Sequence, residues 1–489
     1  MAQVREIQTA TSIEALLDWD QETHMPPKGI TARAAALALV AGLGHEKLLD
    51  RKFARLLDKV EQAQAADPVE ATNVREVRRN YQRRSKLSTA LVQELARTVA
   101  VAKAEWAQAR AASDFGRFAP HLEKLLELKR EVAERIGYDT EPYDALMDEY
   151  EPGARAAAVQ QVFDAVKAEL VPLVQALRSA PRQPDTTILE RPCPVPAQAA
   201  FGRRVAEAMG FDFEAGRMDT SVHPFCTSMS PLDVRITTRY DEHFLPMSLF
   251  GIMHETGHAL YEQGLPAEHA GTPAGTSVSL GVHESQSRLW ENFVGRGRAF
   301  WQHWFGPLQA AFPSLADVSL DAWYHAINVV RPSLIRVEAD ELTYGLHIML
   351  RFDLERRLLG GTLPVAQLPA AWNAGMQQLL GVAPPDDARG CLQDIHWSLG
   401  IFGYFPTYAL GNLYAAQFWA TLRTALPDLD DRLARGDLRT LLDWLRQNIH
   451  RHGQRYRPGE LVEVVTGRPL SHLPYIEYLH AKYKPLYGL

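Results

Sequence analysis

The sequence has little cysteine, which limits the kinds of covalent or metal framework that it can build. Cys193, Cys226 and Cys391 are the only three in 489 residues. An odd number at such wide spacing predicts neither a disulfide framework nor a cysteine-rich metal site. We therefore expect buried or incidental thiols in a reducing compartment.

Long apolar runs are also missing. The longest stretch of low polarity, residues 34–44, is too short to cross a bilayer. Residues 1–12 lack the basic start and the apolar segment that mark a signal peptide. These absences predict a cytoplasmic protein without a membrane partner.

The chain has no excess of positive charge. Lysine and arginine number 52 and aspartate and glutamate 59, which gives a net charge of −7. A nucleic-acid-binding protein needs a basic face. One local basic cluster lies between Arg75 and Lys86, and we expect it to be a solvated helix face with acidic neighbours. No nucleic-acid partner is predicted.

Helical periodicity dominates the rest of the chain, and the 46% of apolar residues suffices for a large buried core. An apolar stripe between Leu122 and Ile136 ends at Gly137, where a C-terminal cap belongs. Similar patterns predict helices from about Thr31 to Ala65 and from Asp340 to Leu359. The fold class predicted is mainly α, and the absence of a fixed repeat argues against a solenoid.

Two stretches depart from the helical pattern. Residues 181–197 are rich in proline and predict a loop between an N-terminal helical section, 1–180, and a C-terminal catalytic section, 198–489, within a single unit. Residues 234–238 are β-branched and alternate, which predicts a small antiparallel sheet. An edge strand there could hold an extended peptide by main-chain hydrogen bonds.

The segment HETGH at residues 254–258 predicts a metal site. His254 and His258 lie four residues apart in a predicted helix, so both imidazoles leave the same face. Two ring nitrogens can then bind one ion at about 2.0–2.1 Å each. Glu255 can reach a water on that ion without binding the ion itself. The same pattern also occurs by chance, and the two histidines are then ordinary residues of a hydrophobic core.

A catalytic zinc ion needs a third protein ligand and an open position. A second predicted helix begins near Val282 and carries two carboxylates, Glu284 and Glu291. Either satisfies the chemistry, and the spacing does not choose between them. The loop 271–277 before this helix contains two glycines and could flex near the site.

Peptide hydrolysis also needs a hydrogen-bond donor for the negative charge that grows on the carbonyl oxygen. His396, Tyr404 and Tyr408 offer such donors, although from spacing alone each of them also fits a packed core position.

Arg336 follows apolar residues and could bind a carboxylate through two hydrogen bonds. The alternative is an internal salt bridge to Glu338 or Asp340. Arg235, on the predicted strand beside Asp233, is equally ambiguous.

Six short motifs occur in a fixed order: WDQETxMP at 19–26, DxRxT at 233–237, HETGH at 254–258, HESQ at 283–286, IRxxAD at 335–340 and GxxQDxHW at 390–397. In these motifs and their order, the chain resembles the carboxypeptidase Taq family of metallocarboxypeptidases over nearly its whole length. The resemblance implies an almost wholly α fold with a deep groove and a small sheet beside it, similar to angiotensin-converting enzyme and neurolysin.

The same resemblance implies an activity, a metal and a ligand set. C-terminal residues are removed one at a time with broad specificity, usually sparing proline. One divalent ion per chain, zinc or cobalt, is bound by His254, His258 and Glu284, and members are typically homodimers.

Roles for the remaining residues follow from the resemblance too. Glu255 acts as the general base, Arg336 grips the terminal carboxylate of the substrate, and His396 helps to stabilise the oxyanion. Tyr408 is assigned to the oxyanion by analogy, with Tyr404 as its rival, and Arg235 is a second substrate-binding candidate.

Two other functions compete with this reading. An oligopeptidase that cuts internal bonds would use the same metal site. A helical binding protein with a structural zinc ion is disfavoured by Glu255, because a structural site needs no base.

Overall fold

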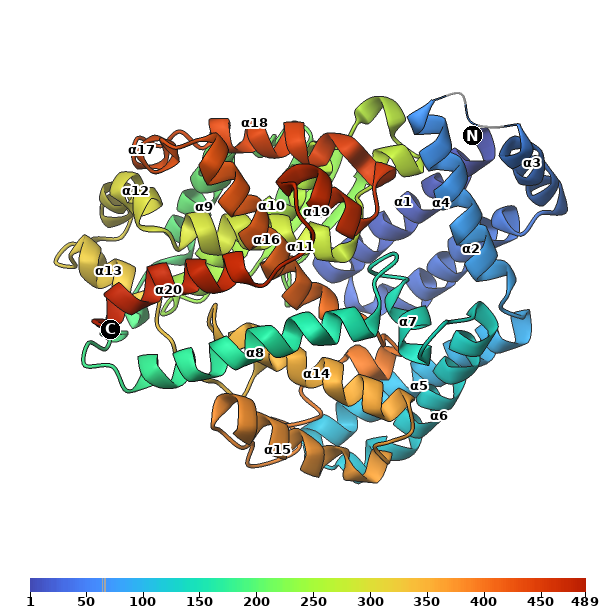
Figure 1. The fold of residues 1–489 in the computed structure, drawn as a ribbon, viewed down its shortest axis with the longest axis horizontal. Coiled ribbons are helices and arrows are strands. Elements are labelled where there is room, and N and C mark those ends of the chain that lie inside the picture. Colours follow the sequence, from blue (N-terminus) through green and yellow to red (C-terminus); the bar gives the residue numbers. More distant parts are fainter. Residues whose placement is uncertain (64, 66) are drawn as a thin grey trace.

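The structure, a computed structural model, describes residues 1–63, 65 and 67–489, and helices make up most of it (Figure 1). The N-terminal part contains α1 (Ala2–Thr23), α2 (Ile30–Leu48), α3 (Arg51–Gln62), α4 (Pro68–Ser85), α5 (Thr89–Ala112), α6 (Phe115–Ile136), α7 (Pro142–Met147) and α8 (Ala156–Arg178).

The remainder of the chain carries the sheet and the other helices. Its elements are α9 (Val195–Met209), β1 (Gly216–Thr220), β2 (Cys226–Ser230), β3 (Asp233–Thr238), α10 (Leu245–Gln263), α11 (Leu280–Arg288), a π-helix (Leu289–Gly295), α12 (Arg298–Ala311), α13 (Leu320–Ala326), α14 (Thr343–Leu359), α15 (Leu368–Leu380), α16 (Pro406–Ala425), α17 (Leu429–Ala434), α18 (Arg439–Asn448), α19 (Pro458–Thr466) and α20 (Leu473–Tyr487). No helix in the described part of the chain combines the length and the apolar character that crossing a membrane requires.

The mainly α fold class is confirmed, and several helix ends follow the sequence signals. Gly137 ends α6 with a φ of +90°, and its N–H donates to the carbonyl of Ala133. The helix predicted from Asp340 begins at Thr343, because the Asp340 carboxylate accepts the N–H groups of Leu342 and Thr343 as a cap.

One helix prediction is wrong in its extent. The segment Thr31–Ala65 is not one helix but two, α2 and α3, with a break at Leu49 and Asp50. The Asp50 side chain accepts the N–H of Lys52 at 2.8 Å and so starts a new helix. The predicted loop at 181–197 ends slightly early, since α9 begins at Val195.

The sheet beside α10 is mixed rather than antiparallel, with the strand order β1-β3-β2. β2 pairs with β3 in the predicted antiparallel sense, whereas β1 pairs with β3 in parallel. The strand predicted at 234–238 corresponds to β3. Strand β2 is therefore an edge of the sheet, and it packs against α1.

Several arginines of the basic cluster in α4 form ion pairs. Arg78 contacts Asp58 at 2.6 Å, and Arg79 and Arg83 share Asp148 at 2.8 and 3.0 Å. These arginines bind α4 to neighbouring segments of the chain.

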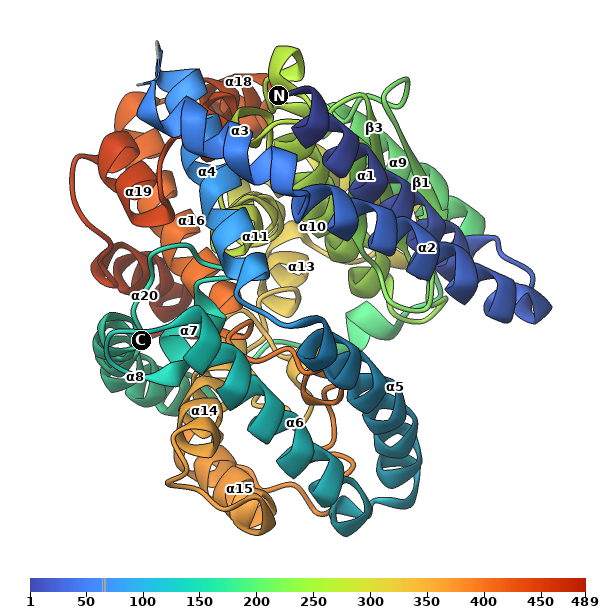
Figure 2. The ribbon, with the colours of Figure 1, turned by 90° about the vertical axis from the view of Figure 1, so that its right-hand side faces the viewer.

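A continuous hydrophobic core runs from Leu91 in α5 to Tyr487 in α20. A smaller cluster, formed by Leu48, Phe53, Leu57 and Val77, holds α2, α3 and α4 together. Figure 2 shows these N-terminal helices grouped with α1 near the sheet, while α5 and α6 lie with α14 and α15 on the other side of the molecule. Helices α10 and α11 lie in the same half of this view as α1, α4 and the sheet (Figure 2).

Two glycines allow α11 to be packed closely between α10 and α16. A Cβ at Gly257 would lie 2.7 Å from the carbonyl oxygen of Gln286, and one at Gly411 would lie 2.5 Å from Cγ of Glu284. Real Cβ atoms are not found so close, so both positions require glycine for this packing. The close contact brings Glu284 of α11 beside the HETGH face of α10.

A buried carboxyl group in α14 makes stability depend on pH. Glu355 is fully buried and accepts hydrogen bonds from Tyr143 Oη, Trp397 Nε1 and the N–H of Gly403. Burial raises the pKa of Glu355 to about 7. This pKa lies above the ordinary value of about 4.3, so stability from the retained proton is present below the unfolded pKa and is lost as pH rises through 7.

We expect Glu355→Gln to remove this dependence, because the amide is neutral at every pH. As the pH rises from 5 to 8, the free energy of unfolding of the unchanged protein should fall by up to about 3 kcal/mol relative to that of the variant. Denaturant titrations at both pH values measure the difference. Glu169→Gln, at an exposed position of α8, is the matched control. Parallel pH profiles for Glu355→Gln and the unchanged protein would contradict the prediction.

Candidate metal centre

Two histidines of α10 and one glutamate of α11 converge on a common point. Glu284 Oε2 lies 3.7 Å from His254 Nε2 and 3.4 Å from His258 Nε2, and the three ligand atoms lie within 4.8 Å of one another. Ligands in a tetrahedral zinc site with bonds of 2.0–2.1 Å stand about 3.3 Å apart. The spacing therefore fits a single divalent ion with three protein ligands.

The protonation of Glu284 and His258 also suits a metal site. Burial alone would raise the pKa of Glu284, but Arg288 and the two histidines outweigh it and hold this pKa well below its usual range. Burial lowers the pKa of His258 to about 3. The carboxylate is thus charged and the imidazole is neutral, which are the forms that bind cations.

Glu255 is only 7% exposed and lies one residue along α10 from His254. Burial raises its pKa to about 7; His254 opposes the shift, while the charges of Glu284 and Glu291 add to it. A carboxylate in this environment accepts a proton more readily than one in water.

Glu291, the other carboxylate suggested by the sequence, lies on the π-helix and faces the opposite nitrogen of His254. Its Oε2 is 2.9 Å from His254 Nδ1. Arg288 is 2.7 Å from Glu284 through Nε and 3.1 Å from Glu291 through one terminal nitrogen. Glu291 therefore orients a histidine, and Arg288 fixes both carboxylates.

Arg336 is 6% exposed and contacts Asp394 instead of either partner suggested by its neighbours in sequence. Its Nε donates to Asp394 Oδ1 at 2.9 Å, and a terminal nitrogen donates to Tyr344 Oη at 3.0 Å. Arg351 donates to the second oxygen of Asp394 at 2.7 Å. The predicted alternative, a salt bridge to Glu338 or Asp340, is wrong. Two buried arginines sharing one aspartate retain a net positive charge, which favours an anionic ligand.

His396, Tyr404 and Tyr408 form one aromatic cluster beside Arg336. The ring of Tyr408 is 5.3 Å from that of Tyr404, and its hydroxyl is 3.4 Å from His396 Nε2. The guanidinium of Arg336 lies 5.2 Å from the Tyr408 ring. Burial lowers the pKa of His396 to about 4, so the ring is neutral.

Tyr344 on α14 connects this cluster to the metal ligands. Arg288 lies over its ring at 4.2 Å, and its hydroxyl accepts from Arg336. The metal ligands, Arg336 and the three aromatic side chains thus belong to one continuous buried site.

Arg235 lies elsewhere. It pairs with Asp233 at 2.9 Å and its guanidinium is 4.3 Å from the ring of Trp19 on α1. Arg217 contacts the same ring at 4.8 Å. No contact in the described part of the chain joins Arg235 to the metal ligands, so the structure places this arginine at the junction of α1 and the sheet.

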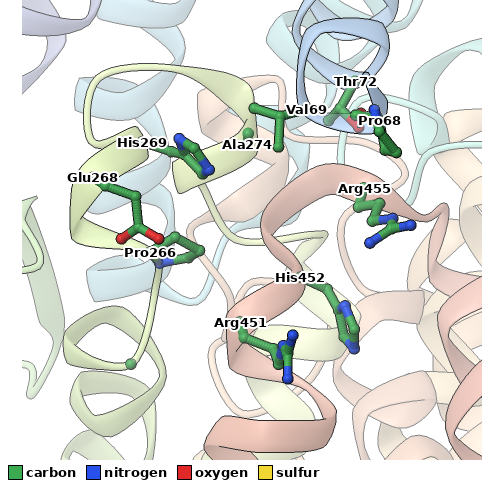
Figure 3. A pocket seen from close by; sticks show the side chains of 11 residues that line it. Pro68, Val69, Thr72, Pro266, Glu268, His269, Ala274, Arg451, His452 and Arg455 are labelled. Atoms are coloured by element: carbon green, nitrogen blue, oxygen red, sulfur yellow. Dashed lines mark hydrogen bonds between the residues drawn. The ribbon is translucent and has the colours of Figure 1, made fainter. Parts of the chain in front are cut away.

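A separate cavity of about 410 Å³ lies between the start of α4, the segment after α10 and the residues after α18 (Figure 3). Its charged and imidazole-bearing lining residues are Arg451, His452, Arg455, Glu268 and His269. None of the metal-site residues described above lies in its wall.

Sequence reasoning did not single out Arg288, Tyr344, Arg351 or Asp394. A signal was present for Arg288, which lies four residues after Glu284 and is its natural partner on a helix face. Asp394 is part of the last motif, but its partner Arg336 is 58 residues away, and only the folded chain reveals that pair.

Comparison with known proteins gives a consistent result. The sequence profile of the family described as carboxypeptidase Taq (M32) metallopeptidase matches residues 1–483. The chain is 47% identical to thermostable carboxypeptidase 1 of Thermus thermophilus over 99% of its own length and 97% of that protein. Identity to carboxypeptidase 1 of Bacillus subtilis is 38%, over 97% of this chain and 95% of the relative.

A solved structure supports the same relationship. The M32 carboxypeptidase of Deinococcus radiodurans superposes with a TM-score of 0.98 at 44% identity, covering 100% of this chain and 98% of that one. Sequence and fold therefore agree over the whole length.

Proposed function

Because the chain belongs to the carboxypeptidase Taq (M32) family of metallopeptidases, we propose that its metal ion is held by His254, His258 and Glu284. The protein is a metallocarboxypeptidase, and hydrolysis at the C-terminus is favoured over cleavage of internal bonds. The observation that carries the proposed ligand set is the convergence of His254 Nε2, His258 Nε2 and Glu284 Oε2.

Glu255 is the proposed general base. When bound, the ion supplies Lewis-acid chemistry, which activates water and polarises the scissile carbonyl. Glu255 accepts the proton of the attacking water and later delivers it to the leaving amine. The buried surroundings of Glu255 support this role, because they favour proton uptake by the carboxylate.

His396 and Tyr408 are proposed to donate hydrogen bonds to the oxyanion, with Tyr404 as the rival of Tyr408. Their position beside Arg336 supports this. Arg336 is proposed to bind the terminal carboxylate of the substrate, so that the last peptide bond lies at the reacting centre. Arg235 is a weaker candidate for substrate binding, since it is engaged by Asp233 and Trp19.

The finer properties of the protein are also proposals. Two imidazoles and one carboxylate suit zinc best, and cobalt fits the same donors. The family resemblance supports broad specificity, one ion per chain and a homodimer. The continuous core, together with the packing of α1 against β2, supports a single working unit of residues 1–489, with sections 1–180 and 198–489. Three free thiols support a cytoplasmic location.

The ligand set is tested by metal removal. Mass spectrometry of a peptide digest should show a ladder of C-terminal losses that stops with chelator and resumes with about one equivalent of Zn²⁺ per chain. His258→Ala should not recover, because two ligands bind zinc far more weakly than three. A ladder that persists in metal-free protein, or stoichiometric zinc in His258→Ala, would refute the assignment.

A further inference from the structure

The metal-facing histidines each use their second ring nitrogen differently. His254 Nδ1 contacts the carboxylate of Glu291 at 2.9 Å. His258 Nδ1 contacts another histidine, with His283 Nδ1 at 2.5 Å. The other nitrogen of His283, Nε2, lies 2.8 Å from Glu262 Oε1. A chain of three side chains therefore extends from His258 to Glu262.

The helices explain this arrangement. Glu262 lies four residues after His258 on α10, so both side chains leave the same face of the helix. His283 enters between them from α11, one residue before Glu284. The rings of His258 and His283 are 4.6 Å apart, and the three side chains are only 15–16% exposed. Water therefore competes little for these hydrogen bonds.

Only one placement of protons makes every contact in the chain favourable. His258 must offer the Nε2 lone pair to the metal, so its proton is on Nδ1 and points to His283. His283 must accept with Nδ1, so its own proton is on Nε2 and points to Glu262. Glu262 accepts as a carboxylate and borders a cavity of about 280 Å³, where its charge can be hydrated.

We propose that His283, held by Glu262, is a positioning residue that fixes the tautomer and ring orientation of His258 for metal binding. This inference rests on the proposed ligand set. Glu291 plays the corresponding part for His254, so each imidazole has its own partner outside the metal site. Such partners fix ring orientation and raise the affinity for the metal.

Metal affinity tests the proposal without reference to turnover. Zn²⁺ competition with a chromophoric chelator should show a dissociation constant about 10–100-fold higher for His283→Phe, which removes the acceptor. His283→Asn should recover most of the affinity, because its side-chain oxygen can take the place of Nδ1. The absorption spectrum of the Co²⁺-loaded protein should change in the Phe variant and return in the Asn variant. His325→Asn, on α13, is the matched control and should bind zinc normally.

The His258→Ala and His283→Phe variants distinguish a wrong ligand set from a wrong role for the hydrogen-bonded series His258–His283–Glu262, here called the relay. If His258→Ala keeps stoichiometric zinc, the ligand set itself fails. If His258→Ala loses zinc while His283→Phe binds it within about threefold of the unchanged protein with the same Co²⁺ spectrum, the relay is overturned. Should His283→Phe not fold, Glu262→Leu removes the last side chain of the relay. This variant is expected to weaken zinc binding by about tenfold. Unchanged affinity in Glu262→Leu would equally overturn the proposal.

Discussion

Exchange of Glu255 for glutamine should lower kcat by about 10³-fold and leave zinc binding close to that of the unchanged protein. Glutamine has nearly the same shape but cannot accept the proton of the attacking water. Glu255 is not one of the three converging ligand atoms, so the metal should remain. Steady-state cleavage of a free-acid peptide and the zinc content of the purified variant measure the two effects.

The fold should survive this change, because Glu255 is a buried carboxylate beside Glu284 and Glu291 and its charge is repelled by theirs. Glu268→Gln is a suitable control: the same substitution, in an exposed turn shortly after α10. It should retain full kcat. Near-normal turnover in Glu255→Gln would assign the base to another residue, whereas loss of zinc together with kcat would mean that Glu255 supports the metal instead.

The fold was predictable wherever the local pattern and the tertiary contacts agree. The apolar stripe of α6 is buried as its spacing requires, and Gly137 ends the helix. The continuous helix predicted over α2 and α3 was wrong because residues that favour helices, mainly Leu, Lys and Arg, continue across the break and only the capping residue Asp50 marks it. Strand direction has no local signal, since alternation is the same in parallel and antiparallel pairs, so the parallel pairing of β1 was missed.

The metal site was predictable only in part from spacing. His254 and His258 lie one helical turn apart, and one turn is all that the two ligands require. The choice between Glu284 and Glu291 depends on how α11 packs against α10, which Gly257 and Gly411 make possible and no spacing rule contains. The family resemblance supplied Glu284, and the geometry explains why Glu291 instead contacts the outer nitrogen of His254.

The surroundings of Arg336 show why local sequence misleads at a buried charge. Asp340 is near in sequence, but its carboxylate is used to cap α14. Asp394 comes from a distant loop and lies between two arginines. The prediction from sequence spacing considered only the nearest acidic residues. In the folded chain the two arginines and one aspartate leave one positive charge in excess, close to His396 and Tyr408.

That excess charge leads to the second large effect. Arg336→Met should reduce kcat/KM on a free-acid peptide by about 10²–10³-fold, because a buried charged hydrogen bond contributes about 3–4 kcal/mol. Cleavage of the C-terminally amidated twin should change little, since the amide carries no charge to bind. The ratio of the two rates, large in the unchanged protein, should therefore fall towards one. Asp394 keeps its contact with Arg351, so the substitution leaves no unpaired buried charge.

Arg235→Met is the control that makes the assignment specific. Both arginines are paired with an aspartate and contact aromatic rings, but Arg235 does so at the junction of α1 and the sheet. If Arg235→Met instead lowers the preference for the free acid while Arg336→Met retains it, the carboxylate is bound at the sheet and the site extends towards α1. If neither change alters the preference, the terminal carboxylate is recognised by another group, and Arg336 serves only to hold Asp394 and Tyr344 in place.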